Sequence, residues 1–178
     1  MSEAQNSKMM SLQILRAIAV LLVMFAHSSE QINGNTIISK QAGNFGVDIF
    51  FVISGFIMVF ISTRRHMGPV DFLRERVTRI VPTYWFYTLL AFAMFLVAPT
   101  AFRGTEGGFG HLLLSMLFIA HENPATGSLS PFLRIGWTLN YEMFFYVAFA
   151  IAMAVARPLR VPLTTGFLLL LTAIGLSA

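Results

Sequence analysis

The 178-residue sequence contains no cysteine and has few charged residues. A chain without cysteine cannot form disulfide bonds, use a thiol nucleophile or bind zinc through thiolates. Charged residues make up 11% of the sequence, whereas a typical soluble domain has about 25%; hydrophobic residues make up 56%, and the mean hydropathy is +0.72. Because a chain of this size has too little interior to bury so much apolar surface, the composition excludes a water-soluble globular protein.

The net charge of +4 and the pI of about 10 would suit a nucleic-acid-binding protein if the positive charges shared one open face. Most of the lysine and arginine residues lie instead in polar stretches between apolar segments. This placement is typical of a membrane protein, whose basic residues gather in the loops on the cytoplasmic side. We therefore expect a lipid bilayer as the partner of this chain, and no nucleic acid.

Apolar segments recur along the chain and predict an all-α fold, a polytopic membrane helix bundle. A helix needs roughly 20 residues to cross a bilayer core of about 30 Å. Segments near this length cover approximately residues 12–27, 45–61, 80–98, 137–156 and 161–178. A further apolar segment at about 112–120 is too short to cross, and we interpret it as interfacial or re-entrant.

Residues 1–178 show no internal repeat or low-complexity linker, so we expect a single membrane-embedded domain. The sequence ends within a hydrophobic run, from which we expect this chain to be the N-terminal part of a longer bundle. A different interpretation of the first segment is a signal peptide, because Lys8 precedes an apolar run and Ala26-His27-Ser28 resembles a cleavage site. Arg16 interrupts the start of that run and further hydrophobic segments follow, which favours a retained helix.

Charge placement predicts the orientation of the chain. If the N-terminus is cytoplasmic, the connection at 62–79 is cytoplasmic too, and it carries five arginine residues. If the short segment does not cross, Arg157 and Arg160 join them, and with Lys8 these make eight of the twelve basic residues. Letting the short segment cross would move Arg157 and Arg160 outside, against the positive-inside rule. We therefore predict a cytoplasmic N-terminus and a short segment that does not cross.

Arg16 and His27 are two ionisable residues in the first apolar segment. Because they are eleven residues apart, they lie on one face of a helix, roughly 16 Å apart along its axis. Ionisable groups inside a bilayer are costly and usually face the interior of a bundle, so this pair is a candidate site. The alternative is that both are interfacial, with Arg16 extending toward the cytoplasm and His27 capping the outer end.

Two carboxylates are further candidates. Asp48 lies near the outer end of the second helix, where it could orient a neighbouring imidazole, as in His-based acyl transfer. It could equally be a carboxylate at a helix N-terminus, favoured by the helix dipole. Glu142 lies about one turn into the helix at 137–156, at a predicted depth similar to that of His27. A carboxylate in apolar surroundings suits general acid–base catalysis, whereas the aromatic residues around it are equally explained as an interfacial belt.

Arg76 and Arg79 are spaced i, i+3 and share one helix face just below the membrane. Such a pair can bind phosphates bidentately. The alternative is that the two arginine residues anchor the helix at the cytoplasmic side or bind anionic lipid headgroups. From charge alone, this second interpretation is favoured.

His111 and His121 flank the short apolar segment. They are ten residues apart and have no i, i+4 partner, so they make a poor metal pair, and we interpret them as interfacial residues. We therefore expect no metal ion. The glycine residues at 104–110 do not make a phosphate-binding motif, because a strand–turn–helix context is missing.

Four motifs together resemble the acyltransferase 3 family of integral membrane acyltransferases, over about residues 11–150. The resemblance is closest to the branch that O-acetylates bacterial exopolysaccharides. The motifs are Leu12-Gln13-x-Leu15-Arg16-Ala17-x-Ala19 with the spacing Arg16-x10-His27; Gly46-Val47-Asp48-x-Phe50-Phe51-x-Ile53-Ser54-Gly55-Phe56; Arg76-x-x-Arg79-Ile80-x-Pro82-x-Tyr84-Trp85; and Trp137-Thr138-Leu139-x-x-Glu142-x-x-Phe145-Tyr146. Each motif is weak alone, but their order and their predicted membrane depths are specific.

The resemblance implies transfer of an acyl group, commonly acetyl from acetyl-CoA, to a hydroxyl of a carbohydrate or glycolipid at the bacterial inner membrane. His27 would be the general base or a covalent acyl carrier, and Arg16 would hold the donor or polarise its carbonyl. Arg76 and Arg79 would contact the phosphates of coenzyme A at the cytoplasmic face. Glu142 would assist proton transfer near the outer face. Family members are considerably longer than this chain.

Two other functions stay open. In a transporter or channel subunit, Arg16, His27, Asp48 and Glu142 would form a proton or ion path that consumes no acyl-CoA. An inactive fragment would insert into the membrane but bind neither donor nor acceptor. The order of the four motifs favours the acyltransferase. The sequence carries no signal for a particular sugar, an acyl chain length or an oligomeric state.

Overall fold

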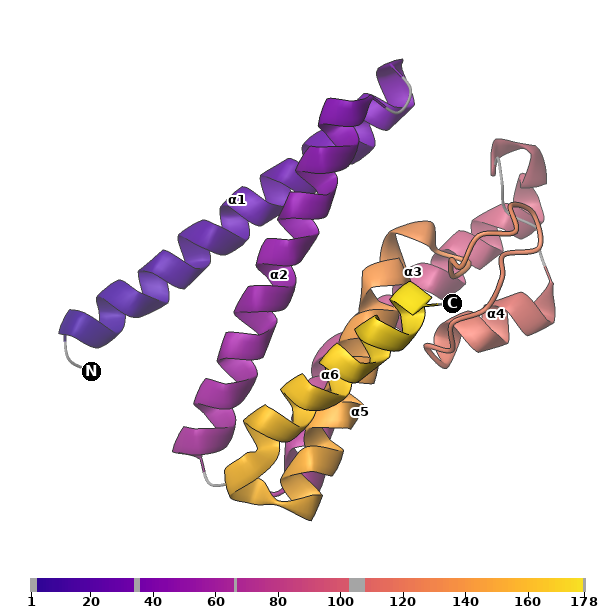
Figure 1. The fold of residues 1–178 in the computed structure, drawn as a ribbon. Helices are drawn as coiled ribbons and strands as arrows, with labels where there is room; N and C mark the ends of the chain where they lie inside the picture. The colour runs from indigo at the N-terminus through magenta and orange to yellow at the C-terminus, as the bar shows by residue number, and fades with distance from the viewer. Residues whose placement is uncertain (1–2, 34–35, 66, 103–107, 178) are drawn as a thin grey trace. The chain divides into compact units, whose positions relative to one another are not determined.

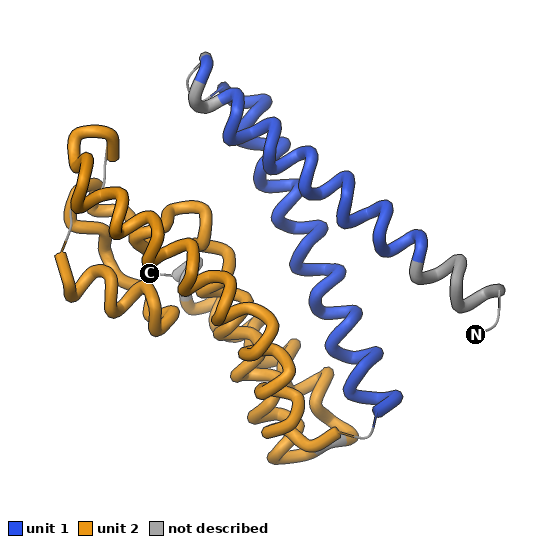
Figure 2. Tube along the Cα trace, turned by 180° about the vertical axis from the view of Figure 1, so that it is seen from behind, with its two compact units in different colours: residues 1–66 blue, residues 67–178 orange. Residues whose placement is uncertain are grey.

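The computed structural model describes residues 3–33, 36–65, 67–102 and 108–177, and these residues form six α-helices joined by short 3-10 helices and loops (Figure 1). This part of the chain contains no β-strand; an isolated bridge pairs Glu122 with Leu129. The chain divides into two compact units, residues 1–66 and residues 67–178, which are coloured differently in Figure 2. The predicted all-α class is confirmed.

Within the described residues, four helical stretches are long and apolar enough to cross a membrane: Met10–Ser29, Ile37–Arg64, Pro69–Val97 and Arg134–Val155. The last apolar helix has a shorter stretch, Arg160–Ile174. The connection expected at 62–79 is largely helical, because one helix continues to Arg64 and the next begins at Pro69. Its arginine and glutamate residues are good helix formers, so the helix extends beyond the apolar segment.

Unit 1 (residues 1–66) is a hairpin of two helices, α1 (Glu3–Asn33) and α2 (Ile37–Arg64). A capping box begins α2: the hydroxyl of Thr36 accepts a hydrogen bond from Ser39 N, and the hydroxyl of Ser39 accepts one from Thr36 N, both 3.1 Å long. These bonds satisfy two backbone N–H groups that would otherwise have no helical partner. The start of α2 therefore follows from local sequence.

Small residues bring α1 and α2 close together. A Cβ atom on Gly46 would lie 2.9 Å from the carbonyl oxygen of Ala19 and 2.9 Å from a methyl group of Val23. A Cβ atom on Gly43 would lie 2.9 Å from the Cβ of Ala26. Backbone approach of this kind is a main source of helix–helix attraction where lipid, rather than water, surrounds the helices.

Unit 2 (residues 67–178) is built on α3 (Pro69–Val97), α5 (Trp137–Val155) and α6 (Arg160–Ser177). Pro69 occupies the first turn of α3, where its missing N–H costs no helical bond, and Asp71 complements the positive end of the helix dipole. Pro82 lies inside α3 and cannot donate to the carbonyl four residues earlier, a gap that membrane helices tolerate.

Contacts between α3 and α5 show that these helices are antiparallel. Near the start of α3, the ring of Phe72 lies 6.2 Å from that of Tyr146 and 5.3 Å from that of Phe149. Further along α3, Tyr84 packs so closely on Gly136 that a Cβ atom there would lie 2.5 Å from the ring. An antiparallel pair is what the predicted topology requires, in which the short apolar segment between α3 and α5 does not cross the membrane. If that segment crossed, α3 and α5 would be parallel.

The short apolar segment forms α4 (Phe109–Met116), which at eight residues is too short to cross a bilayer. It packs against α3: the indole nitrogen of Trp85 donates a hydrogen bond of 2.8 Å to the carbonyl of Met116. Two residues after α4, Phe118 has a φ of 57°, which ends the helix, and its ring lies 4.8 Å from that of Tyr84. These contacts hold α4 on the second half of α3.

The loop between α4 and α5, which we call the 119–133 loop, is fixed by buried polar groups. The hydroxyl of Ser115 donates to the carbonyl of His111 over 2.7 Å and accepts from the N–H of Phe132 over 2.8 Å. The side chain of Asn123, almost fully buried, accepts from Ala125 N over 2.9 Å and donates to the hydroxyl of Ser130 over 3.3 Å. A 3-10 turn, η2 (Arg134–Gly136), then leads into α5.

Candidate functional site

Arg16 and His27 lie on the uninterrupted helix α1, so they share a face as the spacing predicts. The residues of α1 that meet the glycine residues of α2 form a separate stripe, which includes Ala19, Val23 and Ala26. Arg16 and His27 lie about 50–75° around the helix from the middle of that stripe. Arg16 is exposed and His27 is half-buried. This face of α1 thus carries one cation and one imidazole beside the helix contact, not within it.

Asp48 lies on α2 and is exposed. Because Gly43 and Gly46 face α1, the helical rotation from Gly46 to Asp48, about 200°, directs Asp48 to the opposite side of α2. Along the axis of the hairpin, Asp48 also lies about six residues, or roughly 9 Å, away from the level of His27. Within the hairpin, the structure therefore does not bring Asp48 to the imidazole that it was expected to orient.

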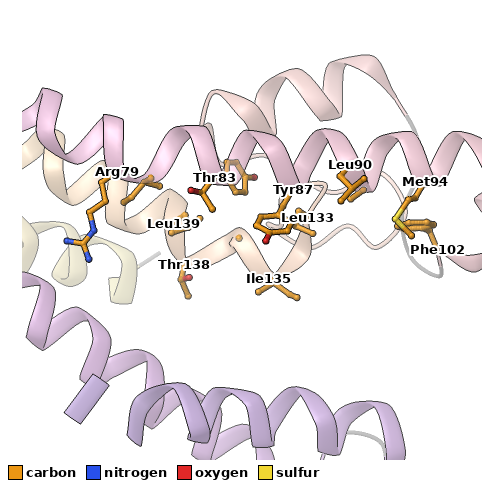
Figure 3. Close-up of a pocket in the computed structure, with 14 residues that line it drawn as sticks. Arg79, Thr83, Tyr87, Leu90, Met94, Phe102, Leu133, Ile135, Thr138 and Leu139 are labelled. Atoms are coloured by element: carbon orange, nitrogen blue, oxygen red, sulfur yellow. The ribbon is translucent and has the colours of Figure 1, made fainter. Parts of the chain in front are cut away.

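A groove with a volume of about 780 Å³ runs along α3 in unit 2 (Figure 3). Its first wall is a stripe of α3 side chains, spaced so that they share one face of the helix. Its second wall comes from the end of the 119–133 loop, from η2 and from the start of α5. The main residues are Arg79, Thr83, Tyr87, Leu90 and Met94 on the first wall, and Leu133, Ile135, Thr138 and Leu139 on the second.

The character of the groove changes along its length. Arg79 lies at one end, and hydroxyl groups of Thr83, Tyr87 and Thr138 line the next part. The far end is apolar and includes Met94, beyond which Phe102 lies. From Arg79 to Met94, α3 rises about 22 Å. A groove with this gradient suits a ligand that has an anionic head and a long, less polar arm.

The two arginine residues of the i, i+3 pair differ in their surroundings. Arg79 is exposed and lines the groove. Arg76 is only 4% exposed; its guanidinium lies 5.6 Å from the ring centre of Phe72 and 3.9 Å from the carboxylate of Glu75. Of the two, only Arg79 lines the groove. The expectation that both arginine residues lie on an open face is therefore wrong for Arg76, which is buried.

Glu142 lies on α5 and is half-buried; its Oε1 accepts a hydrogen bond from the hydroxyl of Tyr146. The antiparallel register of α3 and α5 places Glu142 within about one helical turn of the level of Arg79. The sequence placed these two residues at opposite faces of the membrane. The structure differs, because α5 pairs with the first half of α3 while α4 and the 119–133 loop occupy the second half.

Several polar residues for which the sequence predicted no functional role lie in unit 2. Tyr146 holds the carboxylate of Glu142, and its i, i+4 spacing was the signal that could have found it. The hydroxyls of Tyr84 and Thr88 are buried and lie one helical turn apart on α3. His111 and His121, expected as separate interfacial residues, are in direct contact. Among the residues that the structure describes, no group of three potential metal ligands occurs.

The helices and the groove define a class of protein: a multi-pass α-helical membrane protein with ionisable side chains within its spans. Residues 10–178 match the sequence pattern of a protein family described as an acyltransferase domain. The chain therefore belongs to this family of membrane acyltransferases. The resemblance to the acyltransferase 3 family is thereby confirmed.

Three curated relatives are similar to the chain. It is 43% identical over 135 residues to the exopolysaccharide production protein ExoZ of Rhizobium meliloti (strain 1021), a match that covers 75% of this chain and 41% of ExoZ. It is 31% identical over 168 residues to a Komagataeibacter xylinus protein that bears the name membrane-bound transacylase BcsY, a match that covers 90% of this chain and 40% of that protein. It is 26% identical over 162 residues to the acyltransferase MdmB of Streptomyces mycarofaciens, a match that covers 85% of this chain and 41% of MdmB. The chain thus spans about two fifths of these relatives. No solved structure matches it significantly.

Proposed function

We propose that this chain is part of an inner-membrane O-acyltransferase with a cytoplasmic N-terminus. It moves an acyl group, acetyl in the simplest case, from acyl-CoA to a hydroxyl of an exported or surface polysaccharide. Family membership supports the acyl transfer, and the similarity to an exopolysaccharide production protein supports the acceptor class. The observation in the structure that carries the donor assignment is the groove, with Arg79 at one end and an apolar far end.

The groove fits the chemistry of an acyl-CoA donor. The phosphates of coenzyme A need a cation, and the guanidinium of Arg79 can bind phosphate oxygens bidentately. The uncharged arm that follows meets the hydroxyls of Thr83, Tyr87 and Thr138, and the acyl end meets the apolar part of the groove. Arg76, buried beside Phe72, adds positive potential near the same end of α3. With the N-terminus cytoplasmic, this end faces the compartment that contains acyl-CoA.

The reaction needs one base and one way to stabilise a developing negative charge. The acceptor hydroxyl oxygen attacks the thioester carbonyl, the carbon–sulfur bond breaks, and the hydroxyl proton ends on the released thiol. We assign His27 as the general base or as a covalent carrier of the acyl group, and Arg16 as the cation that holds the donor or polarises its carbonyl. Glu142, held by Tyr146 at the level of Arg79, assists proton transfer as a relay and not at the thioester itself, which lies toward the far end of the groove. Because Asp48 faces away from α1, no role toward His27 is assigned to it.

The decisive experiment measures acetyl esters on the exported polysaccharide by proton NMR. A strain that lacks the full-length gene is complemented with the wild type or with His27→Ala at matched membrane expression. We expect the wild type to restore the esters and His27→Ala to leave them absent. A second arm incubates membranes with labelled acetyl-CoA and follows the label into polysaccharide.

Two results would overturn the proposal. If deletion leaves every acyl ester unchanged, the polysaccharide is not the acceptor. If membranes instead move protons or ions in a His27-dependent manner without consuming acyl-CoA, the transporter interpretation replaces the acyltransferase.

A further inference from the structure

The rings of His111 and His121 meet at α4, outside the groove. His111 Nδ1 lies 2.6 Å from His121 Nε2, and the ring centres are 4.7 Å apart in an edge-to-face arrangement. His121 Nδ1 lies 2.7 Å from the carbonyl oxygen of Ile119. A carbonyl oxygen can only accept, so His121 Nδ1 carries a proton, and in neutral His121 the Nε2 atom is an acceptor. The proton between the two rings therefore belongs to His111 Nδ1.

The remaining ring nitrogen, His111 Nε2, is buried and has no hydrogen-bond partner among the described residues. The His111 side chain is 5% exposed, and its ring lies 5.8 Å from the ring centre of Phe132. In the neutral pair this nitrogen carries no proton. When both rings are neutral, these contacts thus allow one arrangement of tautomers, which leaves one basic nitrogen in apolar surroundings.

An additional proton cannot enter this pair without a cost. If the bond between the rings is kept, the extra proton must go to His111 Nε2, whichever ring carries the positive charge. A buried N–H without an acceptor is unfavourable, and a buried charge is more unfavourable still. If the extra proton goes to His121 Nε2 instead, two donors face each other and the bond breaks. Protonation therefore favours separation of the rings.

The surroundings of His111 strengthen this effect. Burial lowers the pKa of His111, and a positive charge on His121 lowers it further. On α4 and on the loop, His111 contacts Ser115 and Phe132. Phe132 in turn contacts Phe92 and Phe95 of α3. None of these described residues titrates in this pH range. The nearest charged residues along the loop are Glu122 and Arg134, and both are exposed. The group whose charge opposes protonation of His111 is thus His121.

We propose that His111 and His121 form a pH-dependent latch, which fastens α4 to the 119–133 loop at neutral pH and releases it in acid. Residues of α4 and of the loop meet at this pair and at the bond between Ser115 and Phe132. Leu133, at the end of the loop, lines the groove. Release of the latch therefore loosens one wall of the groove, and the medium on the side of α4 controls it.

The direction of the pH dependence follows from the lowered pKa. Opening lets His111 return to its ordinary pKa of about 6.5 and take up a proton, so acid favours the open state. The closed state has its full stability above about pH 6.5 and loses it as the pH falls below that value. Between pH 7.5 and 5.5, the opening equilibrium should rise by up to about tenfold.

Hydrogen–deuterium exchange of the full-length protein in lipid nanodiscs tests the latch. Peptides from residues 108–133 are followed at about pH 7.5 and about pH 5.5, with labelling times scaled for the intrinsic pH dependence of exchange. Two variants keep a hydrogen bond between the two positions: His121→Gln offers an acceptor oxygen and removes the charge of residue 121, and His111→Asn keeps a donor but lacks the buried nitrogen. His66→Gln, at another histidine, is the matched control, and peptides of α5 are the internal reference.

We expect wild type and His66→Gln to exchange about three- to tenfold faster in acid across residues 108–133, with α5 unchanged. In His111→Asn this acid effect should disappear, and in His121→Gln it should be smaller than in the wild type, because only burial then opposes protonation of His111. The latch is excluded if wild type shows no acid effect there. It is also excluded if both variants keep the whole effect, which would assign it to other groups. If one variant fails to insert, the other decides the outcome alone.

Discussion

Gly46 of α2 lies directly against the carbonyl oxygen of Ala19 of α1, with 2.9 Å between that oxygen and the position of a Cβ atom on residue 46. A backbone carbonyl cannot rotate away as a side chain can, so the two helices must separate if residue 46 gains a side chain. The face of α1 that carries Arg16 and His27 is placed by this contact. The glycine thus positions a candidate site without taking part in it.

We predict that Gly46→Ala lowers the free energy of unfolding by about 1–3 kcal/mol, the usual cost of overpacking. Gly55→Ala is the matched control, because its Cβ atom would meet nothing within 4 Å. That control should be neutral or stabilising by up to about 1 kcal/mol, since alanine is the better helix former. Thermal unfolding in detergent measures both. Equal effects at the two positions would mean that α1 and α2 do not pack as described.

Ser115→Ala should destabilise the 119–133 loop. The substitution removes the acceptor of the Phe132 N–H, a bond of 2.8 Å, and leaves that buried group unpaired. The expected cost is about 1–3 kcal/mol. Ser128→Ala, which changes an exposed hydroxyl, should stay within about 0.5 kcal/mol of the wild type. Exchange of residues 108–133 at neutral pH reports the difference, and a loop indifferent to Ser115→Ala would contradict the assigned hydrogen bond.

The variant Glu142→Gln distinguishes a role of the carboxylate in proton transfer from a role in stabilising the fold. Glutamine keeps a side-chain oxygen for the hydroxyl of Tyr146 but cannot exchange a proton, so stability should change little. Acyl transfer should fall about 10²–10⁴-fold, the usual contribution of a general acid–base group. Tyr146→Phe keeps the ring contact with Phe72 and should cost less activity than Glu142→Gln. If activity follows only the amount of folded protein in both variants, Glu142 is structural.

Arg79→Ala should raise the KM for acyl-CoA and leave kcat less affected. Loss of a charge-assisted bond of about 1.5–3 kcal/mol corresponds to roughly a 10- to 150-fold rise. Arg79→Lys should recover only part of the affinity, because an ammonium group cannot bind bidentately. Arg74→Ala is the control: this arginine is exposed on the same helix, on the side away from the stripe that lines the groove. A similar KM for both alanine variants would exclude the groove as the donor site.

The sequence predicted much of the fold for a physical reason that is local. Lipid requires about 20 apolar residues for each crossing, so the long segments and the short one at α4 can be read from hydropathy alone. The shared face of Arg16 and His27 needs only a continuous helix. The ends of α2 and α3 were predicted less well, because charged residues such as Glu75 extend a helix beyond its apolar part as readily as they end it.

The neighbours of each polar group depended on tertiary packing. Which side of α2 faces α1 is set by Gly43 and Gly46, and this packing turns Asp48 away. Glu142 lies at the level of Arg79 because of the register in which α5 packs along α3. This register depends on contacts between distant parts of the sequence, so the spacing of residues within one helix does not predict it. The contact between His111 and His121 arises because the loop folds back onto α4. The sequence by itself thus determined the class of the protein and its candidate residues, and the tertiary structure decided which of them can act together.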